Sequence, residues 1–248
     1  MKNKLKRVLY TLLSVLIWIT VWEILARVID LNFVFPTFLE TLKVFASLII
    51  SKHFWVTILS SLMRILLGFI IGSALGIAIA PLTHRFEFLK ALITPAMTVI
   101  KSTPVASFIL VLWCIIGKHT VPTAIGVLMV MPIVWQNLSD GFDSIDSGLN
   151  EVCAVFEVSR LKRLKILVIP TLVRFLIPAL ITSSALAWKS GIAAEIIVYA
   201  KNSIGKEIID AKNFFESATM FAWTIAVILL SIAIEFTIKK LMKAVKKL

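Results

Sequence analysis

Long apolar stretches separated by short charged segments dominate the chain. Charge-free intervals fall at residues 8–22, 65–83, 91–100 with 102–117, 119–139, 175–188 and 217–234. An α-helix needs about 20 apolar residues to cross a bilayer, and long charged side chains near its ends can reach the interface, so each helix can extend past its interval. The pattern predicts an all-α, polytopic membrane protein with about six transmembrane helices.

The composition agrees with this prediction. Of 248 residues, 59% are hydrophobic and 16% are charged, and the mean hydropathy is +0.98. This length accommodates six spans and short loops but no separate catalytic domain. We expect one transmembrane domain over 1–248, in which 1–56 hold the first span and an outer interfacial helix. The remainder, 57–248, forms a five-span core with a cytoplasmic loop at about 140–170.

The net charge of +12 reflects membrane topology rather than nucleic-acid binding, because the basic residues border apolar runs and form no compact basic and aromatic face. With the N-terminus in the cytoplasm, 16 Lys and Arg residues fall inside and seven outside. The positive-inside rule therefore predicts that both termini are cytoplasmic. The basic and apolar start resembles a signal peptide, but no small-x-small cleavage site follows, so we expect an uncleaved first span.

An amphipathic helix is predicted between the first two spans. Thr37 and Glu40 form a capping-box pattern after Pro36. Leu39, Leu42, Ala46 and Ile49 then share one helical face, which is typical of a helix lying on the outer membrane surface. An ordinary connector without a role of its own is an equally open interpretation.

Two spans carry features of close packing or of a cavity. Gly68, Gly72 and Gly76 recur every fourth position in the second span, which favours close approach of another helix and leaves a substrate-lining role as the alternative. Pro95 and Pro104 are predicted to break the third span, and Lys101 precedes the second break. Such a break borders a cavity or serves packing alone.

Four ionisable residues lie in or near predicted spans, where they are costly unless they are paired or face water. They are Arg64, Lys101, Lys189 and Glu195. In the fifth span Gly191 and Glu195 lie on a face of small residues, with Lys189 nearly opposite. We interpret these residues, with Pro104, as candidates for a translocation pathway, Glu195 contributing to an outer gate. The alternative is that Glu195 reaches the outer interface and that Lys189 binds a carbonyl of a neighbouring helix.

The longest interruption of the apolar pattern carries the strongest functional signal. Between 140 and 165 five acidic residues precede four basic ones. A short helix capped by Asp146 or Ser147 is predicted here. Its apolar stripe consists of Leu149, Val152, Cys153 and Phe156. A second helix is predicted from Ser159 to Ile169, ended or kinked by Pro170. Helices this short are unstable alone, so the first must dock against its own spans or a partner protein.

The same loop resembles a known sequence pattern. Glu151-Val152-Cys153, Glu157 six positions after Glu151, and Leu167, Ile169 and Pro170 resemble the EAA loop of ABC importer permeases. Shorter similarities to the nitrate/sulfonate/taurine-type subfamily extend along most of the chain. They are Ser60 to Phe69, Leu112-Trp113 with Gly117, and Ala211 to Phe215.

The resemblance implies a type I ABC permease fold in a bacterial inner membrane, with the segment from Asp146 to Phe156 as a coupling helix. It further implies a second copy of the chain, two ATPase subunits that bind ATP and magnesium, and an extracytoplasmic binding protein. The family pattern has glycine where this chain has Glu157. Glutamate takes a positive φ only at a steric cost, so we expect a turn of different shape at Glu157.

Catalytic and metal motifs are absent from the sequence. Gly117-Lys118-His119 and Gly205-Lys206-Glu207 both lack the Ser or Thr that ends a nucleotide-binding P-loop. His53, His84 and His119 fall in separate segments, so we expect no metal site and no cofactor on this chain. An ion-coupled secondary transporter and a membrane scaffold are the competing functions, and an ATPase subunit should copurify only with an ABC permease.

Overall fold

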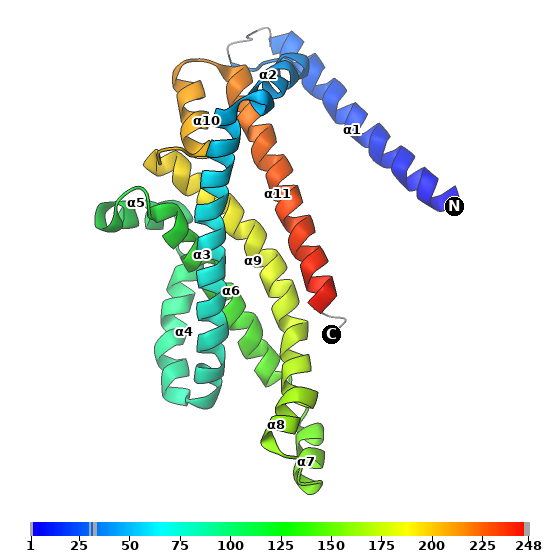
Figure 1. Cartoon of the computed structure of the whole chain (residues 1–248), viewed down its shortest axis with the longest axis vertical. Coiled ribbons are helices and arrows are strands. Elements are labelled where there is room, and N and C mark those ends of the chain that lie inside the picture. The colour runs from blue at the N-terminus through cyan, green and yellow to red at the C-terminus, as the bar shows by residue number, and fades with distance from the viewer. Residues whose placement is uncertain (1, 30, 32–33, 246–248) are drawn as a thin grey trace.

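The computed structural model describes residues 2–29, 31 and 34–245, and within these ranges it contains helices and connecting segments but no strands (Figure 1). The helices are α1 (Lys2–Ile29), α2 (Phe38–Ile50), α3 (Lys52–Arg85), α4 (Glu87–Ser102), α5 (Val105–Ile116), α6 (Val121–Asp143), α7 (Ser147–Val155), α8 (Arg160–Arg163), the π-helical turn η1 (Leu164–Val168), α9 (Ile169–Val198), α10 (Ile204–Asn213) and α11 (Ser217–Val245).

Among the described residues, five helices are long and apolar enough to cross a membrane, and the bent pair α4–α5 makes up to six. The predicted all-α polytopic fold is therefore confirmed. The helices exceed the charge-free intervals, most clearly α3, which begins at Lys52 rather than near residue 65. Polar and charged residues at helix ends explain the difference, because they can reach the interface without ending the helix.

The third predicted span is broken at one proline rather than two. α4 continues through Pro95, whereas α4 and α5 meet at Thr103 and Pro104 with a bend of 107°. Pro95 removes a single amide donor and the neighbouring turns preserve the helix, so the predicted break at Pro95 is wrong. At Pro104 the chain leaves helical geometry altogether, and α5 projects sideways from the bundle in Figure 1.

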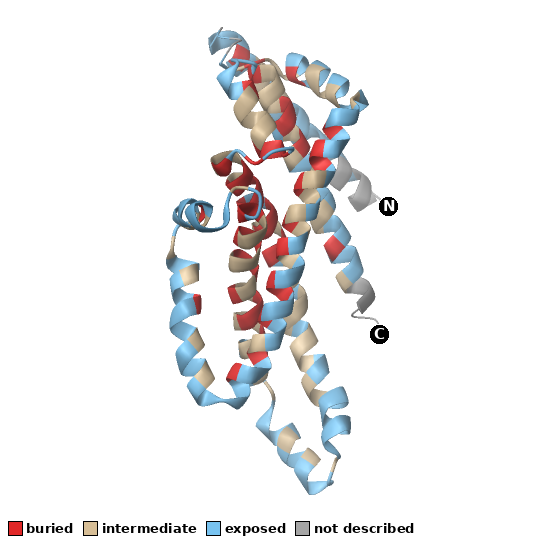
Figure 2. Ribbon diagram, turned by 60° about the vertical axis from the view of Figure 1, so that its left-hand side comes forward, coloured by how far each residue is buried: buried red, intermediate tan, exposed pale blue. Residues whose placement is uncertain are grey.

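α3, α6 and α9 form the core of the molecule, where most of the buried residues in Figure 2 lie. Gly68, Gly72 and Gly76 of α3 allow the closest contact. A Cβ atom at Gly68 would lie 2.5 Å from the Thr123 carbonyl oxygen, and one at Gly72 would lie 2.9 Å from that of Val127. No side chain fits at these distances, so α3 and α6 are in backbone contact along this stripe.

α2 connects the outlying helix α1 to the core. Its capping box is confirmed. The Thr37 hydroxyl accepts a hydrogen bond from the Glu40 backbone amide, and the Glu40 carboxylate accepts one from the Thr37 backbone amide. Thr41 of α2 is buried, whereas the predicted apolar face from Leu39 to Ile49 is exposed. α1 extends away from the bundle (Figure 1). Trp22 of α1 packs its ring against Phe38 and Phe221.

The second helix of the loop at about 140–170 does not end at Pro170. α8, η1 and α9 follow one another without a break, and a single continuous segment runs from Arg160 to Val198. The π-helical turn Leu164–Val168 lies directly before Pro170. A wider turn at this point accommodates the ring and the missing amide of proline, so the predicted end or kink at Pro170 is replaced by a local change of helix type.

Candidate functional site

α7 lies at the tip of the molecule, beyond the ends of the long helices (Figure 1). The Asp146 carboxylate caps this helix by accepting a hydrogen bond from the Leu149 backbone amide at 3.1 Å. Asp146 is thus the cap among the two residues, Asp146 and Ser147, that the sequence predicted. Arg163 of α8 donates to the Asn150 side chain at 3.0 Å and links the two short helices. No residue of α7 is buried, so the chain itself supplies no core for this helix.

The apolar stripe of α7 faces solvent. Exposed fractions are 51% for Leu149, 50% for Val152 and 76% for Phe156, whereas Cys153 is half-buried. The neighbouring Glu151 is exposed as well. Three large apolar side chains on a two-turn helix outside the bundle are typical of a surface that a partner protein covers.

Glu157 adopts the conformation that glycine favours. Its φ is +46°, and the hydrogen bonds Val158 N to Cys153 O and Glu157 N to Ala154 O close a Schellman motif after α7. Glu157 therefore takes a positive φ despite its steric cost. The backbone turn outweighs the side-chain penalty, which is about 1–2 kcal/mol for a left-handed residue.

A second constellation, which we call the Glu195 clamp, joins α3, α9 and the start of α10. Glu195 Oε1 accepts a hydrogen bond from Arg64 Nη1 at 3.0 Å, and Oε2 accepts one from the Ser61 hydroxyl at 2.8 Å. The Gly205 amide approaches the same Oε2 at 3.4 Å. Glu195 is 0% exposed and the Arg64 side chain 18%, so this carboxylate is completely enclosed.

Arg64 also holds the loop after α9. Its Nη2 donates to the carbonyl oxygens of Lys201 at 2.8 Å and Asn202 at 3.0 Å, and to the Ser60 hydroxyl at 2.7 Å. Tyr199 and Asn202 in this loop both have positive φ, 52° and 49°. The clamp therefore stabilises a backbone conformation that the loop residues do not favour on their own.

These contacts divide the predicted pathway residues into two groups. Glu195 is buried, so the alternative in which its side chain reaches the outer interface is wrong. Gly191 is closely packed as well, because a Cβ atom there would lie 2.6 Å from the Ile65 side chain. Arg64, Gly191 and Glu195 are thus packed inside the subunit. Lys101, Pro104 and Lys189 are exposed. Within the described part of the chain Lys189 forms no hydrogen bond, so it does not bind a neighbouring carbonyl.

The pairing of Arg64 with Glu195 was not apparent in the sequence. The two residues are 131 positions apart, and the sequence argument treated each charge separately. One signal was present: opposite charges that each interrupt an apolar stretch are expected to find each other in lipid.

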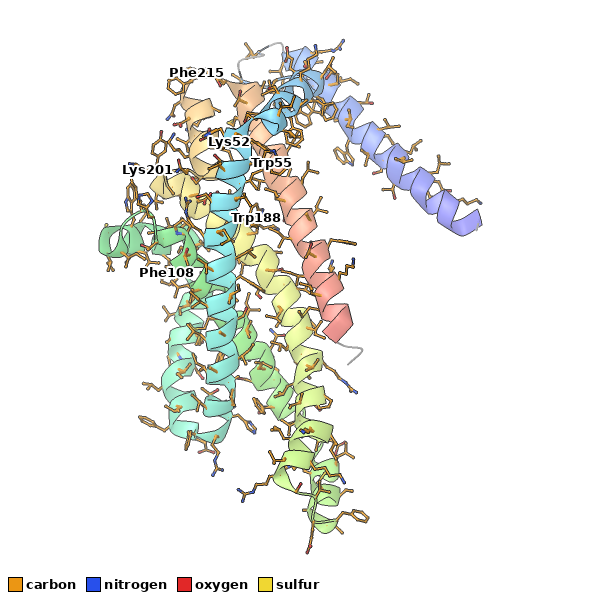
Figure 3. The ribbon with its side chains drawn as sticks, in the orientation of Figure 1. Lys52, Trp55, Phe108, Trp188, Lys201 and Phe215 are labelled. Carbon is orange, nitrogen blue, oxygen red and sulfur yellow. The ribbon has the colours of Figure 1, made fainter. Side chains whose placement is uncertain are left out.

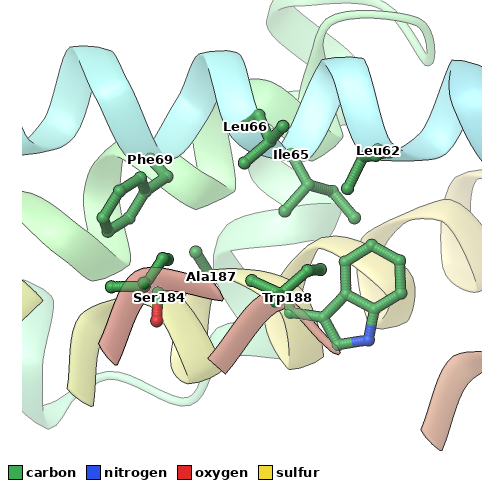
Figure 4. Close-up of a pocket in the computed structure, with 9 residues that line it drawn as sticks. Leu62, Ile65, Leu66, Phe69, Ser184, Ala187 and Trp188 are labelled. Carbon is green, nitrogen blue, oxygen red and sulfur yellow. The ribbon is translucent and has the colours of Figure 1, made fainter. Parts of the chain in front are cut away.

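The void between α3 and α9 is too small for a solute. Figure 4 shows Leu62, Ile65, Leu66 and Phe69 of α3 opposite Ser184, Ala187 and Trp188 of α9. The void between them has a volume of about 10 Å³, barely that of one water molecule. A translocation path through this subunit alone is excluded at that position.

α10 carries a small polar cluster together with Tyr199, which follows α9. The Asp210 carboxylate accepts hydrogen bonds from the Tyr199 hydroxyl and the Lys206 ammonium. Burial raises the pKa of Asp210, but these two donors outweigh it and hold the pKa below its usual range. The hydrogen bond to Asp210 also raises the pKa of Lys206. No group of three or more His, Cys, Asp or Glu residues among the described positions could hold a metal ion.

Sequence comparison agrees with this architecture. Residues 68–247 match the family described as "Binding-protein-dependent transport system inner membrane component", and the chain belongs to this family. It is 23% identical over 207 residues to a putative aliphatic sulfonates transport permease protein, SsuC, of Bacillus subtilis, covering 82% of this chain and 74% of that protein.

Two further relatives come from Synechococcus elongatus. The bicarbonate transport system permease protein CmpB is 30% identical over 162 residues, 64% of this chain and 57% of the relative. The nitrate import permease protein NrtB is 29% identical over 167 residues, 66% of this chain and 58% of the relative. The chain thus spans somewhat more than half the length of these two permeases.

Solved structures show the same fold at low identity. A crystal structure of an amino acid ABC transporter with histidines aligns with a TM-score of 0.59 at 18% identity, covering 75% of this chain and 89% of that one. An inward-facing MetNI methionine ABC transporter aligns with a TM-score of 0.56 at 14% identity, covering 77% and 93%. The chain is a membrane-spanning permease subunit of an ABC importer, and ATP hydrolysis belongs to a separate subunit.

Proposed function

We propose that two copies of this chain form the translocation pathway of an importer in a bacterial cytoplasmic membrane, as one permease domain each. Two ATP-binding cassette subunits, with their ATP and magnesium, bind on the cytoplasmic side, and an extracytoplasmic protein delivers the solute. The named relatives carry sulfonates, bicarbonate and nitrate, so the solute is a small anion or a related small organic compound. Closure of the ATPase pair moves the subunits between outward-open and inward-open states.

The exposed stripe of α7 is the observation that carries this proposal. Leu149, Val152 and Phe156 have no partner surface within the described part of the chain, and a short amphipathic helix fits the groove of a partner protein. The segment from Asp146 to Pro170 would then transmit the movement, because α8, η1 and α9 form one continuous helix from the loop into the bundle.

The distribution of charge supports the proposed orientation. The loop from 140 to 165 carries four basic residues, the tail from Lys239 carries five, and the N-terminal segment carries four. In Figure 1 the C-terminal end of α11 and the N-terminal end of α1 both lie toward the side of α7, away from α2 and α10. Both termini and α7 are accordingly assigned to the cytoplasm.

The experiment compares two exposed phenylalanines in the reconstituted complex. Phe156→Asp places a charge in the α7 stripe, and Phe88→Asp makes the same change at the start of α4, where the side chain is also 76% exposed. Stimulation of ATP hydrolysis by the binding protein should fall about tenfold or more for Phe156→Asp, as for a central interface residue. It should be nearly unchanged for Phe88→Asp. Equal stimulation in both variants would contradict docking through α7.

A further inference from the structure

An open cavity lies where the broken span meets α9. It has a volume of about 320 Å³ and is bordered by Lys101 and Thr103 at the end of α4, Val105 at the start of α5, Pro132 of α6 and Leu186 of α9. This volume is within the range of small-molecule sites. Unlike the closed void in the bundle, the cavity has room for a solute.

The open face of α9 beside this cavity is not a lipid-facing surface. From Thr171 to Val198 the exposed positions are Arg174, Pro178, Thr182 and Lys189. None of these is a large apolar residue. The exposed faces of α3 and α11 are aliphatic and aromatic by contrast, with residues such as Leu67, Ile70, Ile232 and Phe236. When a helix long and apolar enough to span a membrane exposes only two cations, a hydroxyl and a proline over this range, that face is expected to line a water-filled path.

One cation borders this cavity and a second lies near it on α9, and neither has a counter-charge among the residues that the structure describes. Lys101 borders it directly, and Lys189 lies one helical turn beyond Leu186 on α9. Neither ammonium forms an ion pair or a hydrogen bond within residues 2–29, 31 and 34–245. Glu195, the acidic residue within α9, is buried and paired with Arg64. The site is therefore electropositive and unsatisfied.

The start of α5 adds to the positive field. Pro104 provides no side-chain cap, so the first amides of α5 lack a side-chain acceptor. Val105, which follows the break, borders the cavity. The N-terminal end of a helix carries a partial positive charge, and broken spans in transporters direct such ends at anionic groups of the substrate.

We propose that Lys101, Lys189 and the N-terminal amides of α5 form the anion-binding site of the translocation path. The ligand class is a small oxyanion, such as a sulfonate, bicarbonate or nitrate, whose oxygen atoms accept hydrogen bonds from both ammonium groups and from the α5 amides. This inference rests on the proposed function, because it assigns the exposed face of α9 to the pathway.

The test uses the full transporter in liposomes, with labelled methanesulfonate, bicarbonate and nitrate supplied in turn with the binding protein. The double variant Lys101→Gln with Lys189→Gln removes both charges and keeps polar side chains. Lys52→Gln, an exposed lysine at the start of α3 (Figure 3), is the matched control. Uptake and ATP hydrolysis stimulated by the binding protein are measured in parallel.

Uptake should fall on the order of tenfold or more in the double variant, as for a lost charge pair. Stimulated hydrolysis should stay within about twofold, which shows intact folding and coupling. Lys52→Gln should transport normally, and Lys101→Arg with Lys189→Arg should restore much of the rate.

Two results would overturn the site. One is unchanged uptake in the glutamine double variant. The other is a wild-type complex that couples to ATP hydrolysis and transports none of the three anions. Either leaves the ABC permease function intact, whereas loss of stimulated hydrolysis in the wild type would contradict the proposed function itself.

Discussion

The Glu195 clamp gives a stability prediction whose size follows from its geometry. Glu195 is enclosed and accepts hydrogen bonds from Arg64 and Ser61, so removing one partner leaves the other charge in a low-dielectric interior. Breaking a buried ion pair in this way costs about 3–5 kcal/mol. The two single substitutions should fall at different ends of that range.

The difference arises from the remaining hydrogen bonds. In Glu195→Gln, Arg64 still donates to the Lys201 and Asn202 carbonyls and to Ser60, so we expect a loss of about 3 kcal/mol. In Arg64→Met, the carboxylate keeps only the Ser61 hydroxyl and the Gly205 amide, and the expected loss is about 5 kcal/mol. The double variant should lose about 1.5–3 kcal/mol less than the sum of the two.

Thermal unfolding in detergent measures these differences. For a chain of this length about 1 kcal/mol corresponds to a shift of the midpoint by about 2–4 °C, so the single variants should unfold about 6–20 °C below the wild type. Arg85→Met, at the exposed far end of α3, is the control and should leave the midpoint nearly unchanged. Additive effects of the two clamp substitutions would refute an energetic coupling between Arg64 and Glu195.

Three other properties follow from individual residues. Gly68→Ala should destabilise the subunit by about 1–3 kcal/mol in the same thermal assay, because the new Cβ lies 2.5 Å from a carbonyl oxygen, and an unchanged midpoint would argue against the contact of α3 with α6. Glu157→Gly should slow amide hydrogen exchange in α7 by removing a left-handed strain of about 1 kcal/mol, and Glu157→Val should accelerate it. The pKa of Asp210 is lowered, so its ion pair stabilises the fold above about pH 4 and this contribution is lost as the pH falls further. Asp210→Asn should therefore lower the unfolding midpoint at pH 7, and its difference from the wild type should narrow as the pH falls below about 4; a difference that stays constant with pH would contradict the assignment.

Sequence alone predicted the features that depend on local pattern. The apolar intervals located the spans, the Thr37–Glu40 pattern predicted a capping box that the structure contains, and Asp146 caps α7 as expected. These features arise from interactions within a few residues, which a sequence displays directly. The predicted ends of the long helices were less accurate, because a charged residue near a helix end can belong either to the helix or to the loop that follows it.

Contacts between distant segments could not be read in the same way. The pairing of Arg64 with Glu195 depends on how α3 packs on α9, and the 107° bend at Pro104 depends on the space that α6 and α9 leave for α5. At Glu157 a local residue preference was itself a poor guide to the backbone conformation. A residue preference argued against a positive φ there, but the hydrogen bonds that close α7 determine the backbone.

The chain contains two cysteines, which permit a direct test of the central claim that α7 binds the ATPase subunit. Cys153 lies on α7, and Cys114 lies on α5, well away from α7 in Figure 1. A short photo-crosslinker is attached to Cys153 in a Cys114→Ser variant, and to Cys114 in a Cys153→Ser variant, before reconstitution with the ATPase. We predict an adduct with the ATPase subunit from Cys153 and none from Cys114. Absence of the Cys153 adduct in a complex that hydrolyses ATP, or equal labelling from both positions, would contradict the account.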